Sequence, residues 1–147
     1  LITIEMIREL QKSGVIVVGL TARSFEICDR TIEQLYSIGI DLSRASLWHE
    51  QLWHDCYLPY YHKNGIIFCD GNDKGKVLTH VFERLSYTPS KIIAVDDKEK
   101  NLHSIKKVLH PDIEFIGIRY GYLDPIVNAF DHEQAELELQ KYLIRIQ

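Results

Sequence analysis

Short runs of apolar residues alternate with amphipathic helices along most of this chain, and no other feature of its sequence constrains the fold as much. The runs Val15–Leu20, Lys91–Val95 and Ile113–Ile118 are rich in β-branched residues, as is typical of strands covered on both faces of a parallel sheet. Apolar residues at helical spacing predict helices over Ile4–Lys12, Ser24–Gly39, Lys74–Leu85, Leu102–Leu109 and Ala135–Ile146. This order predicts an α/β fold of Rossmann-like type, a parallel sheet with flanking helices and right-handed crossovers.

The alternation is interrupted between Arg44 and Asp70, a segment rich in aromatic residues and histidines. Within it, Tyr60–Phe68 contains Asn64 and Gly65, the residue pair favoured in the tight type I′ turn of a β-hairpin. We therefore expect a small hairpin insertion within one domain that spans residues 1–147.

Size and charge exclude some classes of partner. The chain has 147 residues, the size of one domain, and its net charge of -4 gives no general reason to bind nucleic acid. No apolar run approaches the roughly 20 residues of a membrane-spanning helix.

The three cysteines, Cys28, Cys56 and Cys69, have no CxxC spacing, and an odd number cannot pair completely within one chain. Free thiols favour a reducing compartment such as the cytoplasm. A signal peptide upstream of Leu1 would not be visible in these residues, so the localisation stays open.

Compact polar residues follow the first predicted strand, where ligands of open parallel sheets bind. Thr21 offers a hydroxyl group and neighbouring backbone amides, and Ser24 opens a helix whose N-terminus favours negative charge. This arrangement suits a phosphate group. The alternative is that Thr21 and Ser24 are only turn and capping residues.

Asp96 and Asp97 follow the predicted strand Lys91–Val95 directly. Adjacent carboxylates are costly there unless a cation or hydrogen-bond donors compensate them, and Mg²⁺ prefers such oxygen ligands. The alternative is that one of the two caps the helix that follows.

Lys74 lies in the turn-rich segment Gly71–Gly75, which opens a helix. Its ammonium group could act there as a point charge for a phosphoryl oxygen. Lys76 is so close in sequence that periodicity alone does not choose between the two.

The order Thr, Lys, Asp-Asp is more specific than its parts. It resembles the haloacid dehalogenase superfamily, whose second motif is an apolar strand ending in Thr or Ser, whose third is a Lys before a helix, and whose fourth is a strand ending in an acidic pair. VVGLT matches the second motif at Thr21, DKGKVL the third at Lys74, and IIAVDDKEKN the fourth at Asp96, Asp97 and Asn101. The surrounding sequence segments are similar to a bacterial branch of the superfamily whose function is uncharacterised. These segments are TARS, YHKNGIIFCDGNDKG and GIRYGY.

The resemblance implies Mg²⁺-dependent covalent phosphoryl transfer, as in a phosphatase, from a phosphorylated small molecule or a phosphoprotein. The catalytic residues that it implies are Thr21, Lys74 and Asp97. The substrate-binding residues are Thr21, Ala22, Arg23, Ser24 and Lys74. The metal ligands are Asp96 and Asp97, and Asn101 would support them from the first turn of the next helix.

One motif of the superfamily is missing. The first motif, Asp-x-Asp-x-Thr/Val after an apolar strand, carries the nucleophile, occurs nowhere in these residues, and by its usual order precedes Leu1. We therefore expect the chain alone to be catalytically inactive. We also expect its sheet to lack a central strand, unless another segment or a partner chain supplies it.

Two other interpretations compete with this one. A receiver domain of phosphorelay signalling also combines an acidic pair, a Thr and a Lys, but there the acidic pair comes first in the chain. A non-enzymatic binding module would use the aromatic insertion as a protein interface instead of packing it beneath the hairpin. Its aromatic residues are Trp48, Trp53, Tyr57, Tyr60 and Tyr61.

A zinc site is suggested by His49, His54, Cys56 and His62. However, His49 and His54 are five residues apart, about 140° around a helix, and do not converge as in the His-Glu-x-x-His motif. The chain also lacks the GxGxxG and GKS/T loops of nucleotide-binding Rossmann and P-loop proteins.

Overall fold

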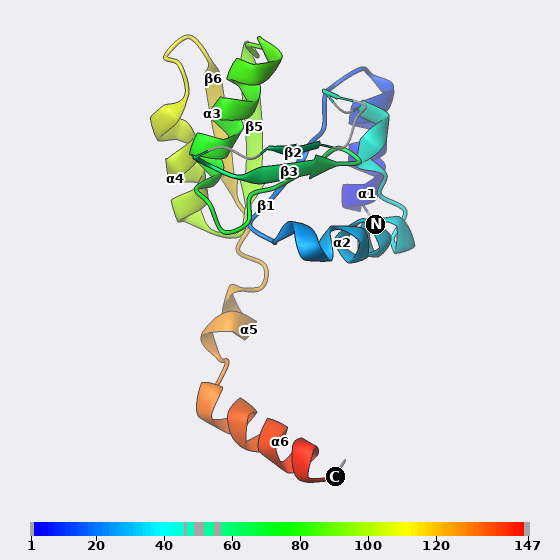
Figure 1. Cartoon of the computed structure of the whole chain (residues 1–147), viewed down its shortest axis with the longest axis vertical. Coiled ribbons are helices and arrows are strands. Elements are labelled where there is room, and N and C mark those ends of the chain that lie inside the picture. Colours follow the sequence, from blue (N-terminus) through cyan, green and yellow to red (C-terminus); the bar gives the residue numbers. More distant parts are fainter. Residues whose placement is uncertain (1, 46, 49–51, 55–56, 146–147) are drawn as a thin grey trace.

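The computed structural model describes residues 2–45, 47–48, 52–54 and 57–145, and Figure 1 shows a rounded body from which the C-terminal helices project. The helices are α1 (Ile2–Lys12), α2 (Cys28–Ser37), α3 (Lys74–Leu85), α4 (Glu99–Val108), α5 (Asp124–Asn128) and α6 (His132–Arg145), with 3-10 turns η1 (Phe25–Ile27) and η2 (Leu42–Ala45). The strands are β1 (Gly19–Thr21), β2 (Leu52–His54), β3 (Tyr60–Lys63), β4 (Ile66–Phe68), β5 (Lys91–Asp96) and β6 (Glu114–Arg119). The predicted mixed α/β class is confirmed. Among the described residues, no helix has the length and apolar character needed to cross a membrane.

In the part of the chain that the structure describes, the strands form two sheets, where the sequence predicts one parallel sheet. The larger sheet has the order β1-β4-β3-β2, with β4 parallel to β1 and the hairpin strands antiparallel. The smaller sheet is the parallel pair β5 and β6. The predicted hairpin is present, and its strand β4 lies beside β1 in the larger sheet.

The hairpin turn has the predicted type. Asn64 and Gly65 have φ angles of 49° and 75°, both positive as a type I′ turn requires, and Lys63 pairs with Ile66. A side chain at Gly65 would overlap the carbonyl group of Leu42, so this turn also needs the small residue for packing.

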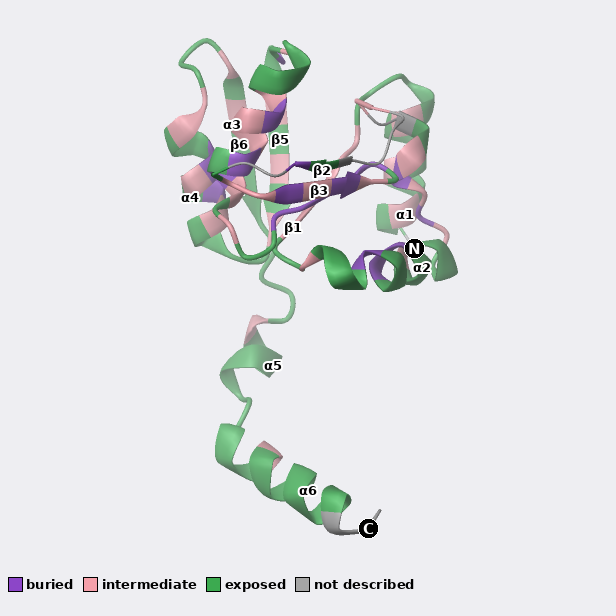
Figure 2. Ribbon diagram, in the orientation of Figure 1, coloured by how far each residue is buried: buried purple, intermediate pink, exposed green. Residues whose placement is uncertain are grey.

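Among the described residues, two apolar clusters cover the larger sheet, one on each face. Ile66 and Phe68 of β4 pack with Ile32 of α2, whereas Ile67, between them in sequence, packs with Val77 of α3. This alternation follows from the two-residue period of a strand. Figure 2 shows that the buried residues gather around this sheet and α3, while α5 and α6 are mostly exposed.

Helix α3 joins the two sheets. It covers one face of the larger sheet and packs against α4, which in turn packs on β5 and β6. The carboxyl ends of β1, β4 and β5 are thereby brought to one region of the molecule.

Candidate functional site at the strand ends

Hydrogen bonds connect the polar segments that follow β1, β4 and β5. The backbone amide of Cys69 donates to the carbonyl oxygen of Thr21 at 2.8 Å, and that of Gly71 donates to Ala22 at 2.9 Å. Lys74 then opens α3, and its Nζ donates to Oδ2 of Asp96 at 2.6 Å. The structure thus links Thr21, Lys74 and Asp96 through a short series of contacts.

The side chains of Lys74 and Asp96 are largely buried. Only 12% of the lysine side chain and 8% of the aspartate side chain are exposed. Removing two charges from water is costly, and such a pair persists only when good geometry and further hydrogen bonds compensate. Those bonds are present, because Oδ1 of Asp96 accepts from the amide of Lys98 and from Nδ2 of Asn101, each at 2.8 Å.

Burial of Asp96 by itself raises the pKa of its carboxyl group. The hydrogen bonds from Lys74, the Lys98 amide and Asn101 outweigh burial, and the net effect is a pKa below the ordinary value. Asp96 is therefore a carboxylate at neutral pH. Asp96 accepts from the amide of Lys98, which is the N-cap residue of α4, and no side-chain capping hydrogen bond is present there.

Asp97 has a different environment from Asp96. Its side chain is exposed. The pKa of Arg119 is raised, mainly by a hydrogen bond to Asp124 and to a smaller extent by the negative charge of Asp97. Asp97 is thus the open carboxylate of the pair.

The residues after β1 form a turn. Oγ1 of Thr21 accepts from the amide of Arg23 at 3.2 Å, as in turns closed by a hydroxyl group. The Arg23 guanidinium donates to Thr31 and Gln34 on α2, at 3.0 and 2.8 Å, so it is directed toward that helix. The capping role considered for Ser24 is wrong, because its side chain makes no capping hydrogen bond with η1, the 3-10 turn that precedes α2.

The structure distinguishes Lys74 from Lys76. Lys76 is exposed, and its backbone amide donates to the capping residue Asp73 at 2.9 Å. The same oxygen of Asp73 accepts from Ser104 of α4 at 2.5 Å, and this bond is the main cause of the lowered pKa of Asp73. Sequence reasoning missed Asp73 and Ser104, although an Asp directly before an apolar helix is a capping signal.

The described residues include no cluster of three or more His, Cys, Asp or Glu side chains arranged to hold a metal ion. Mg²⁺ usually takes only one or two protein carboxylates, with water or phosphate oxygens completing its shell. The donor chemistry of the acidic pair fits this partial role. Because both oxygens of Asp96 already accept hydrogen bonds, Asp97 is the first candidate ligand.

The histidines of the aromatic segment pack together. Nε2 of His54 lies 3.1 Å from Nδ1 of His62, and both side chains are buried. Burial is the main cause that lowers the pKa of His54 to about 4. His49 and Cys56, which the zinc interpretation also needs, lie outside the described residues.

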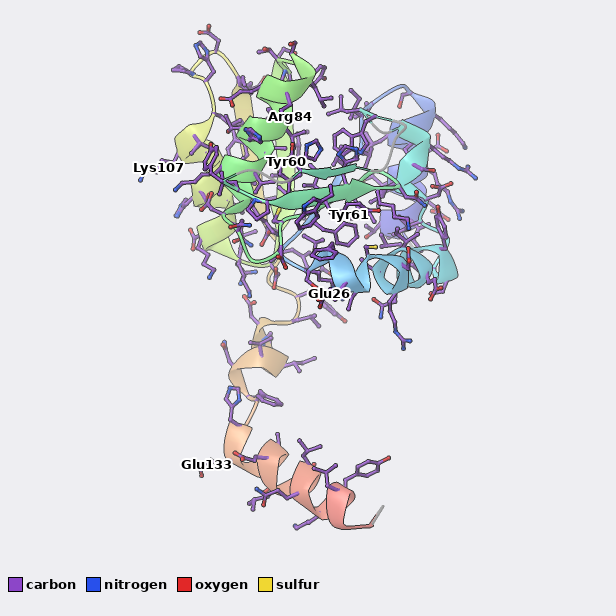
Figure 3. The ribbon with its side chains drawn as sticks, viewed as in Figure 1. Glu26, Tyr60, Tyr61, Arg84, Lys107 and Glu133 are labelled. Carbon is purple, nitrogen blue, oxygen red and sulfur yellow. The ribbon has the colours of Figure 1, made fainter. Side chains whose placement is uncertain are left out.

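The aromatic rings of this segment are divided between core and surface. Tyr60 and Tyr61 project from opposite faces of β3 into the two apolar clusters (Figure 3). Trp48 packs against the cluster of Tyr60, whereas Trp53 is partly exposed and Tyr57 is 81% exposed.

A family model described as "Protein of unknown function (DUF2608)" matches residues 2–145. The chain belongs to the DUF2608 family. The DUF2608 match covers both sheets and the C-terminal helices, and its description assigns no activity. No curated protein and no solved structure matches the chain.

Proposed function

We propose that this DUF2608 chain is the larger part of a phosphotransferase domain of haloacid dehalogenase type, a Mg²⁺-dependent phosphatase whose nucleophile lies outside these residues. The observation that carries the proposal is the buried ion pair of Lys74 and Asp96, at the strand ends where Thr21 also lies. A carboxyl group with a perturbed pKa at the end of a strand, such as Asp96, is typical of functional sites.

The sheet order supports a place for the missing strand. β1 and β5 are both edge strands, and no backbone hydrogen bond joins them in the described part of the chain. A further parallel strand along these edges would end beside Thr21 and Lys74. We propose that such a strand, from another segment or from a partner chain, carries the aspartate nucleophile.

Each residue of the candidate site would then have a separate role. Thr21 would donate its hydroxyl hydrogen to a phosphoryl oxygen, and Lys74 would offset negative charge on the nucleophile and the phosphoryl group. Asp97 would hold Mg²⁺ beside Asp96, and Asn101 keeps the Asp96 carboxylate oriented. Bound Mg²⁺ would supply a positive charge that stabilises the phosphoryl oxygens.

The chain alone would then be inactive, because the covalent route is absent without the nucleophile. The supporting charges would remain. We expect no turnover when a generic phosphomonoester and Mg²⁺ are added to the pure chain. Mg²⁺-dependent turnover that disappears in Asp97→Asn would overturn this statement.

The activity itself is tested on the longer coding sequence. We expect an in-frame apolar strand ending in Asp-x-Asp upstream of Leu1, and Mg²⁺-dependent phosphatase activity in the protein that includes it. Lys74→Met should abolish that activity, whereas Lys76→Met, two residues away and exposed, should leave it unchanged. An upstream strand without both aspartates would contradict the proposal.

A further inference from the structure

One residue of α4 contacts both chain neighbours of Lys74. These neighbours are Asp73, the N-cap of α3, and Gly75. Oγ of Ser104 donates to Oδ1 of Asp73 at 2.5 Å and accepts from the backbone amide of Gly75 at 3.3 Å. A hydroxyl group can donate one hydrogen bond while it accepts another, so the two bonds are compatible. The first turn of α3 is therefore attached to α4 through a single hydroxyl group.

The contact leaves this turn little freedom to move. Gly75 is buried, and a side chain there would overlap the backbone carbonyl group of Ser104. The bond from Ser104 is the main cause of the lowered pKa of Asp73, as expected when a hydroxyl group donates to a carboxylate. The same carboxylate oxygen caps α3 by accepting from the amide of Lys76. Because Lys74 lies between Asp73 and Gly75, its backbone is fixed relative to α4.

Helix α4 also places the partner of Lys74. Nδ2 of Asn101, in the first turn of α4, donates to Oδ1 of Asp96, and Lys74 donates to Oδ2 of the same carboxylate. Asn101 and Ser104 are three residues apart and thus share a side of α4, which lies beside α3 (Figure 1). The same side of α4 therefore contacts Asp96 directly and the chain around Lys74 directly.

We propose that Ser104 is a positioning residue of the candidate site, which fixes where the Lys74 ammonium group lies without contacting the substrate. The inference rests on the proposed function, in which Lys74 offsets negative charge on a phosphoryl group. A lysine side chain has a flexible four-carbon stem, so the place of its Nζ depends on a fixed backbone and a fixed partner. Small displacements of such a charge weaken its action on the ligand.

The ammonium group of Lys74 reports its own position in the full chain without any ligand. We expect a ¹H–¹⁵N signal from it in the wild type, because its bond to Asp96 and its burial slow hydrogen exchange, and Lys74→Met identifies this signal by removing it. Ser104→Ala should broaden or abolish the signal. Thr79→Val is the matched control, because it removes a hydroxyl group whose bond to the Gly75 carbonyl oxygen lies within α3, and it should keep the signal.

Calorimetric titration of the same chains with inorganic phosphate tests whether this position matters to a ligand. We expect Ser104→Ala to weaken phosphate binding about threefold or more, and Lys74→Met to weaken it at least as much. If Ser104 acts through Lys74, Ser104→Ala should weaken binding no further in the Lys74→Met background. Circular dichroism would show that every variant is folded.

The outcomes separate this inference from the proposed function. A wild-type chain without the ammonium signal, an unchanged signal in Ser104→Ala, or a further loss of phosphate affinity in the Lys74→Met background would overturn the positioning role. A wild-type chain that shows the signal but does not bind phosphate would contradict the proposed function instead. In that case the signal in Ser104→Ala would still decide whether Ser104 places the Lys74 ammonium group.

Discussion

Asp96 joins three parts of the molecule through two oxygen atoms. It accepts from Lys74 at the start of α3, and from Lys98 and Asn101 at the start of α4. Because the pair with Lys74 is buried, loss of one partner leaves a charge without compensation.

We expect Asp96→Asn to lower the free energy of unfolding by about 3 kcal/mol, because the Lys74 ammonium group stays buried without its carboxylate. Urea unfolding measures this change. Asp97→Asn is the control, and should cost less than about 0.5 kcal/mol because Asp97 is exposed. Equal effects of the two substitutions would contradict the assignment of the buried charge to Asp96.

The lowered pKa of Asp96 also predicts an acid dependence. Its folded pKa lies below the ordinary value of 3.8, so its contribution to stability is complete above that value and is lost as the pH falls through the folded pKa. Urea unfolding between about pH 6 and about pH 2 should therefore show a steeper acid loss for the wild type than for Asp96→Asn. Parallel curves of unfolding free energy against pH for the two proteins would contradict the assignment of this acid loss to Asp96.

The sequence predicts which positions form this site, but it does not predict all the contacts of their side chains. Thr21 and Asp96 are the last residues of β1 and β5, Lys74 opens α3, and apolar runs in the sequence predict where such strands end. The direction of the Arg23 side chain toward α2 was not readable, because it depends on hydrogen bonds to Thr31 and Gln34 from another element.

At the scale of elements, the contact between α3 and α4 depends on a small residue. The amide of Gly75 in the first turn of α3 donates to Oγ of Ser104 at 3.3 Å. A side chain at Gly75 would overlap the backbone of Ser104, so the two helices approach closely only at a glycine.

We expect Gly75→Ala to destabilise the protein by about 1 to 3 kcal/mol, because the added methyl group forces α3 and α4 apart. In a free helix the same change would stabilise by about 1 kcal/mol, so the sign of the effect is diagnostic. Thermal or urea unfolding measures it, and a stabilised Gly75→Ala variant would refute the close contact.

The pairing of β2 with β3 should weaken in mild acid. Burial first, and then the charges of His62, Arg84 and His80, lower the pKa of His54 to about 4. The unfolded chain takes up a proton near pH 6.5 while the folded chain does not, so stability falls between about pH 6.5 and about pH 4.

His54→Phe should reduce this loss, because phenylalanine cannot take up a proton and can still stack on Tyr60. The matched control is His103→Phe, at an exposed position on α4, which should keep the wild-type slope of stability against pH. An unchanged slope in His54→Phe would show that another group governs the acid loss.

The elements were predictable to different degrees. Helix α3 and strand β5 have clear apolar periods and lie where the sequence predicts them. β2 is too short to show a period, and the predicted strand Val15–Leu20 contracts to Gly19–Thr21. The parallel pairing of β4 with β1 joins residues far apart in sequence, which no local pattern specifies.

At the scale of the whole molecule, two sheets are held together by α3, α4 and the buried pair of Lys74 and Asp96. The edges of β1 and β5 are places where a further strand can add. We propose that a strand bearing the nucleophile lies along these edges.

The most direct test of the central claim is calorimetric titration of the full chain with Mg²⁺. We expect binding that Asp97→Asn weakens about tenfold or more, since Asp97 is the open carboxylate at the strand ends. The control Asp112→Asn alters another exposed carboxylate and should bind as the wild type does. If Mg²⁺ does not bind, or binds equally well to Asp97→Asn, the strand ends are not a cation site and the phosphotransferase proposal fails.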